Sequence, residues 1–208
     1  MIVVESKRLK KETILKRYPN AIICDVTSKA PTELVKLSPF YPHGGIPVPF
    51  SDGYCATCVE AIWQGLKVFE SADVDTALFR NDTMQNIKRT VRKYGKPLGH
   101  RKGVNGKELL GYIEARKQIY IPVYRWVLEH KLMYIIERLR KADEEGKTIV
   151  MLDYDTNADV ENPKKPLSHA SLVRAYALGL PPYDDVQTDG MKKNDAAKKQ
   201  ENIQLTLF

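Results

Sequence analysis

Three polar side chains recur along one apolar segment and are the first candidates for chemistry. The segment runs from Thr57 to Phe69, TCVEAIWQGLKVF, and contains Glu60, Gln64 and Lys67. If the segment is a helix with Thr57 as its N-cap, the spacing places these three side chains on one face, beside an apolar stripe. A carboxylate, an amide and an ammonium group can together bind a polar substrate and move a proton. The same row is also typical of a solvated helix face, and the segment by itself leaves both interpretations open.

A second set of candidates follows the clearest strand of the sequence. Residues 148–153, TIVMLD, are mostly apolar, and the chain continues through Asp153, Asp155, Asn157 and Asp159. Carboxylates at the end of a buried strand are commonly part of a site, because loops held by a rigid sheet carry many functional groups. A turn rich in Asp and Asn is the alternative.

Basic side chains gather in the stretch KYGKPLGHRKG. The candidate ligands for phosphate or DNA are Lys93, Lys96, His100, Arg101 and Lys102, among glycines that let the backbone approach a ligand. Residues 1–180 hold 29 Lys and Arg against 21 Asp and Glu, so the positive excess belongs to the part that is predicted to fold. This excess favours a nucleic acid or a phosphorylated metabolite as partner, although composition alone also fits a protein that binds no anion.

The cysteines, Cys24, Cys55 and Cys58, are too few for a disulfide framework. Cys55 and Cys58 form a lone CxxC without a second ligand pair, and the HxE of zinc nucleobase deaminases is absent, so we expect no metal and no cofactor. No apolar run approaches the roughly 20 residues of a membrane span, and the first residues become charged too early for a signal peptide. We therefore expect a cytoplasmic protein with no membrane partner.

The elements that must position these candidates predict an α+β fold, with a helix-rich single domain around a small sheet over residues 1–180. The longest helical pattern, 107–145, contains Pro122 as an expected break and ends at Gly146. After Gly179 the sequence has no apolar period and the composition of a flexible linker, 181–203. The remaining expectations are a strand over 21–26, a Pro- and Gly-rich loop over 36–53, a polar helix over 75–94, a basic loop over 95–103 and a helix within 166–176 that Ser168 caps.

Two of these stretches resemble the opening of the NADAR family. They are LSPFYPHGGIPVP from Leu37 and TCVEAIWQGLKVF from Thr57, which match a loop with an S-x-F pattern and a helix of the form T-x-E-H-x-x-Q-x-x-K. The resemblance covers roughly residues 35–160 and includes the basic stretch between helices. Two features depart from the family: Ala61 stands in place of the histidine, and the late N-D-x-x-W-G signature has no close counterpart.

The resemblance implies cleavage of a bond between a ribose C1′ and a nitrogen, on riboflavin-pathway intermediates or on ADP-ribosylated nucleobases. This chemistry needs a carboxylate near C1′ and a donor to the leaving base. On this basis the catalytic candidates are Glu60, Asp153 and Asp155, and the substrate-binding candidates are Gln64, Lys67, Trp63, Phe40 and Asn157. The resemblance requires no metal.

The last five residues, QLTLF, resemble the bacterial sliding-clamp-binding motif Q-L-[S/D]-L-F. This resemblance implies that Gln204, Leu205, Leu207 and Phe208 bind the β sliding clamp, with the linker 181–203 giving reach. The alternative is that the apolar side chains pack on the parent domain.

Taken together, these features predict a DNA-associated N-glycosidase or base-exchange enzyme that acts on a modified or ADP-ribosylated nucleobase at the sliding clamp of a bacterium, encoded by the cell or by a phage. Two alternatives stay open. One is a non-catalytic DNA- or protein-binding replication or host-takeover factor, which Ala61 and the missing tryptophan motivate. The other is an N-glycosidase that acts on a phosphorylated ribosyl metabolite.

Overall fold

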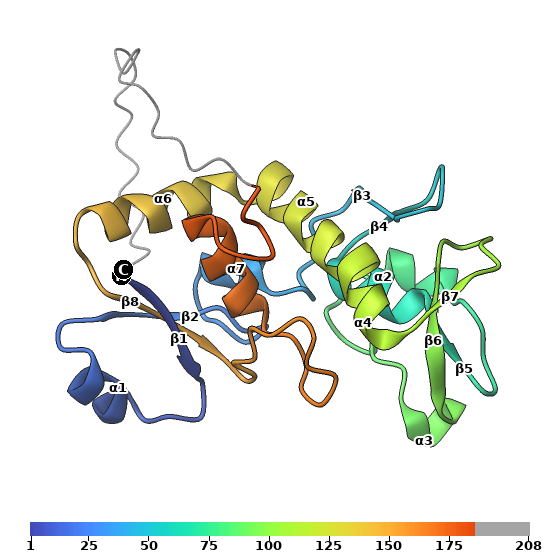
Figure 1. Ribbon diagram of the computed structural model, residues 1–208, viewed down its shortest axis with the longest axis horizontal. Coiled ribbons are helices and arrows are strands. Elements are labelled where there is room, and N and C mark those ends of the chain that lie inside the picture. The colour runs from blue at the N-terminus through green and yellow to red at the C-terminus, as the bar shows by residue number, and fades with distance from the viewer. Residues whose placement is uncertain (186–208) are drawn as a thin grey trace, which may run out of the picture.

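The computed structural model, which describes residues 1–185, has a three-stranded parallel sheet at one end (Figure 1). The strands are ordered β1-β8-β2, with the fully buried β8 in the centre. Apolar residues of β8 alternate between two cores, one against α1 and the other against α6 and α7. The predicted strands 21–26 and 148–153 are confirmed, and β1 was not predicted. The bounds are β1 (Ile2–Ser6), α1 (Lys11–Arg17), β2 (Ile22–Asp25) and β8 (Ile149–Asp153).

A helical rod crosses the molecule from this sheet towards the other end. It contains a π-helical turn immediately before Pro122, and the break falls at Leu132, with φ −129°, and not at Pro122. Pro122 is the second residue of α5 and follows the π turn closely, so the helical register changes where the proline N–H is missing. The elements are α4 (Tyr112–Ala115), the π turn η3 (Arg116–Tyr120), α5 (Ile121–Lys131), α6 (Met133–Glu144) and α7 (His169–Leu178).

Two other predicted helix boundaries are confirmed. Gly146, with φ +74°, follows the end of α6. Ser168 caps α7, because its side chain accepts a hydrogen bond from the Ser171 amide.

An antiparallel sheet, ordered β5-β6-β7, lies at the other end. The predicted helix over 75–94 is wrong: the polar middle of this stretch is irregular, since the side chains of Asn81 and Thr83 bond to the local backbone. The predicted basic loop is also wrong, because most of it pairs with two strands as β6. The bounds are β5 (Lys67–Phe69), the 3₁₀ turn η2 (Thr76–Arg80), α3 (Val91–Tyr94), β6 (Pro97–Arg101) and β7 (Leu109–Leu110).

Helix α2 (Val59–Gly65) runs through the interior, and all of its residues are buried. It is shorter than predicted. Cys58 and not Thr57 is the N-cap, with its Sγ accepting a hydrogen bond from the Ala61 amide. The helix ends at Gly65, where the ring of Phe79 packs so closely that a Cβ would overlap it. The remaining short elements are η1 (Glu33–Leu37), β3 (Ile46–Pro47) and β4 (Cys55–Ala56).

The α+β class is confirmed by this arrangement of helices around small sheets in one domain. The described part packs as far as Asp185, since Tyr183 is buried and Arg125 pairs with Asp185 at 2.7 Å. The rest of the predicted linker 181–203 and the predicted clamp-binding peptide 204–208 lie outside the described residues. Within residues 1–185, no helix has the length and apolar character that a membrane crossing requires.

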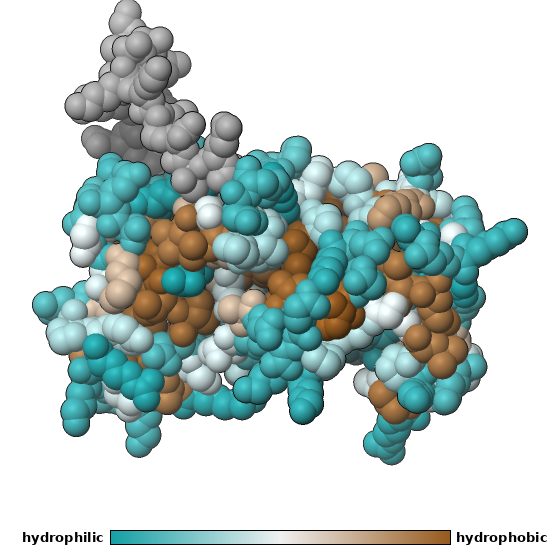
Figure 2. Space-filling model, viewed as in Figure 1, coloured by the Kyte–Doolittle hydropathy of each residue, from teal (hydrophilic) through white to brown (hydrophobic). Residues whose placement is uncertain are grey.

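The surface in Figure 2 is largely hydrophilic, with apolar side chains gathered in a few places. Val91, Leu98 and Leu109 of α3, β6 and β7 are among the large apolar residues that are exposed.

Candidate active site

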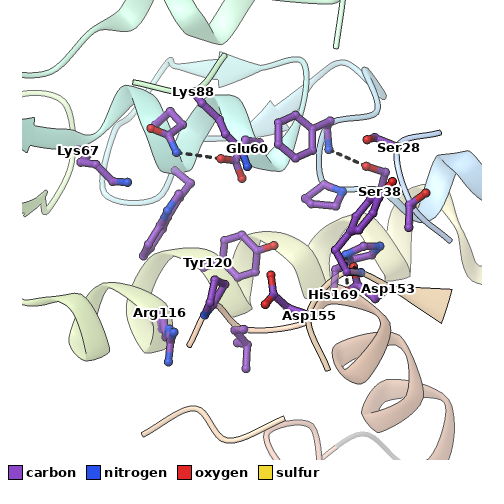
Figure 3. Close-up of a pocket in the computed structure, with 18 of the residues that line it drawn as sticks. Ser28, Ser38, Glu60, Lys67, Lys88, Arg116, Tyr120, Asp153, Asp155 and His169 are labelled. Atoms are coloured by element: carbon purple, nitrogen blue, oxygen red, sulfur yellow. Dashed lines mark hydrogen bonds and ion pairs between the residues drawn. The ribbon is translucent and has the colours of Figure 1, made fainter. Parts of the chain in front are cut away.

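A cavity of about 340 Å³ lies where α2, the π turn and the carboxyl ends of β2 and β8 meet (Figure 3). Its volume suits a small ligand rather than a polymer. The structure brings together here seven of the predicted site residues, from three separate stretches of the sequence. The lining includes the predicted residues Phe40, Glu60, Trp63, Gln64, Lys67, Asp153 and Asp155, with Lys88, Tyr112, Arg116, Tyr120 and His169 in addition.

Glu60 is a buried carboxylate of the cavity, with 8% of its surface exposed. Its Oε1 accepts a hydrogen bond of 2.8 Å from the Gln64 side chain. Burial raises the pKa of Glu60, while the Gln64 bond and the charges of Lys88 and Lys67 oppose the rise. A carboxyl group whose pKa is raised is suited to act as a general acid.

Gln64 connects Glu60 to a segment that the sequence did not mark. Its Oε1 accepts a hydrogen bond of 3.1 Å from the Arg89 amide, and its Nε2 donates to Glu60. The Arg89 guanidinium is buried and donates to the carbonyls of Gln64, Lys67 and Asp73. Gln64 is therefore a fixed part of the cavity wall.

Two lysines enter the cavity from different elements. Lys67 opens β5 and not the end of α2, and its Nζ lies 5.8 Å from the centre of the Trp63 ring. Burial lowers the pKa of Lys67; the charge of Glu60 opposes this shift, and those of Arg89 and Lys88 add to it. Lys88 lies on the loop after η2, with its Nζ 5.4 Å from the centre of the Phe40 ring. Neither lysine forms an ion pair within residues 1–185, so both are able to meet an anionic group of a ligand.

Aromatic rings form much of the remaining wall. Tyr112 and Tyr120 pack against Trp63, with ring centres 5.9 and 5.5 Å from its own. Burial, together with the negative charges of Glu60 and Asp153, raises the pKa of Tyr120 well above its ordinary value. Tyr120 therefore keeps its proton and can donate a hydrogen bond. Flat apolar walls of this kind suit a planar ring such as a nucleobase.

Asp153 and His169 form a buried pair at the sheet end of the cavity. His169 Nδ1 lies 3.0 Å from Asp153 Oδ2, and His169 Nε2 lies 2.8 Å from the Val26 carbonyl. Both ring nitrogens face acceptors, so the imidazolium form fits. Burial alone would lower the pKa of His169, but the hydrogen bond and charge of Asp153 outweigh it and raise the pKa above its ordinary value.

Asp153 has few free lone pairs for a substrate. It also accepts hydrogen bonds from the Ser168 hydroxyl at 2.7 Å and the Tyr154 amide at 2.7 Å. Burial alone would raise the pKa of Asp153, but the bond and charge of His169 and the Ser168 bond bring it below its ordinary value. Through these contacts Asp153 stabilises the start of α7. Asp155 is therefore the second carboxylate of the cavity, after Glu60, that is open to a ligand.

The loop that carries Asp155 is fastened by Arg116. The Arg116 guanidinium, 2% exposed, donates to the carbonyls of Val160, Asn162 and Lys165 and to the Tyr112 hydroxyl. Figure 3 shows the carboxylates of Glu60 and Asp155 and the hydroxyl of Tyr120 directed into the cavity. The predicted substrate ligand Asn157 does not line the cavity; its side chain donates within the loop, to the Asp159 carbonyl.

The predicted anion-binding residues do not line the cavity; they lie on α3 and β6 or directly beside them. Lys93 and Lys96 are exposed, whereas Arg101 pairs with Asp73 at 2.8 Å and Lys102 with Glu108 at 3.0 Å. His100 is 2% exposed behind Trp63, with ring centres 3.7 Å apart and neither ring nitrogen partnered. Burial, and after it the charge of Lys67, lower the pKa of His100 to about 3. His100 is therefore a neutral core residue that is not placed to bind an anion.

No group of three or more His, Cys, Asp or Glu side chains in residues 1–185 is arranged to hold a metal ion. Cys55 is exposed, and Cys58 is occupied as the cap of α2.

The sequence analysis missed several residues of the cavity. Tyr112, Arg116 and Tyr120 share one face of the predicted long helix at four-residue spacing, a signal that could have found them. Lys88 gave no such signal, because the loop that carries it reaches the cavity only through tertiary contacts. His169 follows the predicted cap Ser168, and its pairing with Asp153 depends on how α7 packs on the sheet.

The fold and cavity define an α+β protein with a small, half-open site that has a mixed polar and aromatic lining. The chain belongs to DUF6939, a family of unknown function, whose model matches residues 6–173. This match spans every residue that lines the cavity. No curated protein matches the chain.

Proposed function

We propose that the cavity binds a ribosyl group joined to a nucleobase and that the protein hydrolyses the N-glycosidic bond. The observation that carries this proposal is the position of Glu60, a buried carboxyl group of raised pKa beside aromatic walls and a second carboxylate. Two carboxyl groups in unlike environments are what cleavage through an oxocarbenium-like transition state requires. The resemblance to the NADAR family in the stretches around Glu60 supports the same reaction.

The two carboxylates divide the work in this proposal. Glu60 donates its proton to the leaving nitrogen, and Asp155, at the more open side, stabilises positive charge at C1′ and orients water. Trp63 and Phe40 hold the planar base, and the Tyr120 hydroxyl donates to it. Lys67 and Lys88 hold a phosphate of the substrate.

We propose DNA as the carrier of the target nucleotide and the bacterial sliding clamp as the tether. The excess of Lys and Arg over Asp and Glu in residues 1–180 and the QLTLF ending support this part of the proposal. A cavity of about 340 Å³ admits about one nucleoside, so the target would have to leave the duplex. Tethering raises the local concentration of a weak DNA binder.

One observation favours a phosphorylated ribosyl metabolite as a second candidate substrate. Lys67 and Lys88 reach the cavity itself, whereas Arg101 and Lys102 of the basic stretch are already paired with carboxylates. Such a metabolite would use the same carboxylates and need no DNA surface.

The decisive experiment is mass spectrometry of the bases that the protein releases. The substrates are unmodified DNA, phage-modified DNA, ADP-ribosylated DNA and free ribosyl-nitrogen 5′-phosphates. We expect release by the wild type that Glu60→Gln abolishes and the control Glu70→Gln retains. Glu70 is exposed, and among described residues its side chain accepts a hydrogen bond only from the Lys96 amide. Release that persists in Glu60→Gln would overturn the role of Glu60, and no release from any substrate would favour a binding protein.

The tether has a separate test. Binding of the full chain and of a chain lacking residues 204–208 to purified β clamp is compared by surface plasmon resonance. Loss of binding on deletion is expected, and undiminished affinity would contradict the proposed tether.

A further inference from the structure

The amide of Gln64 has a single orientation in this structure. Its one neighbour on the far side from Glu60 is the Arg89 main-chain N–H, which can only donate, so the Gln64 oxygen must face it. The Gln64 NH₂ group is thereby turned towards Glu60 Oε1, at 2.8 Å. The orientation of the Gln64 amide therefore makes Glu60 Oε1 the acceptor of a hydrogen bond.

The Arg89 side chain fixes the position of its own main-chain N–H beside the Gln64 oxygen. Nη1 donates to the carbonyls of Gln64 at 3.4 Å and Lys67 at 2.5 Å, and Nη2 donates to the Asp73 carbonyl at 2.9 Å. The guanidinium carbon lies 4.9 Å from the ring centres of both Phe69 and Tyr94. These contacts fasten residue 89 to the end of α2, one turn away from Glu60.

The second oxygen of Glu60 is free to act. Oε2 makes no hydrogen bond within residues 1–185, and Figure 3 shows the carboxyl group of Glu60 with one oxygen bonded to Gln64 and the other turned into the cavity. A proton placed on Oε1 would meet the N–H of Gln64, and one placed on Oε2 meets no donor. The working atom of Glu60 is therefore Oε2.

We propose that Arg89 is the positioning residue of this site, which fixes the Gln64 amide and thereby directs the Oε2 proton of Glu60 into the cavity. The inference rests on the proposed hydrolysis for its kinetic consequence and on geometry alone for the orientation of the amide. The other titratable groups that interact with Glu60 are Lys67, Lys88, Tyr120 and the Cys58 thiol.

Arg140 provides a matched control. Its guanidinium also donates to carbonyls at the end of a helix, those of Ala177 at 3.0 Å and Tyr176 at 3.2 Å, and lies over the Tyr176 ring. It does not line the cavity. Substitution of either arginine removes hydrogen bonds to carbonyls at a helix end, but only Arg89 is linked to Glu60, through the hydrogen bonds of Gln64.

The experiment compares Arg89→Gln, Arg89→Lys and Arg140→Gln in the full chain. Thermal melting, kcat and KM on the substrate found for the wild type, and the ¹³C carboxyl resonance of Glu60 as a function of pH are measured for each. The Glu60 resonance is assigned by its absence in Glu60→Gln.

For Arg89→Gln we expect kcat to fall at least about tenfold with little change in KM, because a group close to the chemistry is displaced while the walls persist. Loss of the Gln64 donor should raise the pKa of Glu60, which the resonance reports directly. Arg89→Lys should recover part of kcat, since an ammonium group can still reach a carbonyl. Arg140→Gln should lower the melting temperature and leave kcat and the Glu60 titration unchanged.

Two results would overturn the inference: equal loss of kcat in Arg140→Gln, or an unchanged Glu60 titration in Arg89→Gln. If the wild type turns over no substrate, the proposed hydrolysis fails while the titration still decides whether Arg89 positions Glu60. If Arg89→Gln does not fold, the same titration is carried out on Arg89→Lys. An unchanged Glu60 pKa in a variant whose Gln64 side-chain NH₂ resonances have shifted would count against the inference, because the amide would have moved without an effect on Glu60.

Discussion

The buried carboxyl group of Glu60 lowers the stability of the fold when it ionises. A carboxyl group with a raised pKa holds its proton more tightly in the folded than in the unfolded chain, so the free energy of unfolding falls as pH rises above the ordinary value of 4.5. Buried titratable groups at functional sites commonly lower the stability of the folded protein.

We therefore expect Glu60→Gln to stabilise the protein at neutral pH, by about 1 kcal/mol, while it removes activity. The neutral amide of Gln keeps an acceptor for Gln64 and carries no charge to bury. Urea unfolding of both proteins at pH 4.5 and pH 7.5 measures the effect, and the advantage of the variant should grow with pH. A constant difference would show that Glu60 is not buried as a titrating group.

The His169–Asp153 pair stabilises the folded protein within a window of pH, because the pKa values of its two members are shifted in opposite directions. The pKa of His169 is raised, so its contribution is fully present below its unfolded value near 6.5 and is lost as pH rises through the higher folded value. The pKa of Asp153 is lowered, so its contribution is present above about 3.8 and is lost as pH falls through the lower folded value. The pair is most stabilising between these limits.

We expect the difference in unfolding free energy between the wild type and His169→Gln to shrink as pH rises above about 6.5. Gln retains a donor for Asp153 and does not titrate, which makes it the suitable comparison. Chemical denaturation at pH 5.5, 7 and 8.5 is the measurement. A difference that grows with pH would mean that His169 is neutral in the folded protein.

At the scale of elements, the loop after β8 owes its shape to one arginine on the π turn. The Arg116 guanidinium donates hydrogen bonds to three carbonyls of this loop. A π turn suits this task, because it shifts the side-chain register at a point where Arg116 and Tyr120 must both face the cavity.

We expect Arg116→Met to cost about 2 kcal/mol of unfolding free energy and to release the loop 154–167. Methionine fills the volume but donates no hydrogen bond to the three carbonyls. Limited proteolysis should then cut within 154–167 in the variant and spare the wild type. Equal protection of the loop in both proteins would show that its other contacts suffice.

The sequence could supply part of this organisation, and the reason differs from element to element. Gly146 and Ser168 were predictable because helix ends depend on local backbone chemistry. Glu60 and Gln64 were predictable from helical spacing, although Lys67 joins them from a strand. The strand β6 was not predictable, since its pairing with β5 and β7 is non-local and a Gly- and Lys-rich stretch carries no strand signal.

At the scale of the whole molecule, the exposed cations of α3 and its surroundings lie at the end opposite α1 (Figure 1). Arg92, Lys93 and Lys96 are exposed and form no ion pair within residues 1–185. They follow directly on the loop that brings Lys88 to the cavity. The DNA proposal therefore predicts that this end of the molecule, and not the basic α1 end, meets phosphate.

We expect the triple variant Arg92→Gln, Lys93→Gln, Lys96→Gln to weaken DNA binding by at least tenfold at low salt, and to reduce the slope of log affinity against log salt by about 2 to 3. The control, with Lys10, Lys11 and Lys16 changed to Gln, has the same net charge and alters the α1 end. Fluorescence anisotropy with a labelled oligonucleotide measures both. If both triple variants weakened DNA binding equally, net charge alone would explain the loss, and the α3 end would not be the binding surface.

The stacking of Trp63 on His100 also gives the molecule an optical probe. The chain has two tryptophans, and the other, Trp126, stacks on His130 away from the cavity. In a Trp126→Phe background all indole emission would come from a ring that forms the cavity wall. With the pKa of His100 held at about 3, the imidazole behind that ring does not change charge over the working range. A compound that binds in the cavity against Trp63 should alter its emission, so candidate ligands could be screened by fluorescence before any reaction is known.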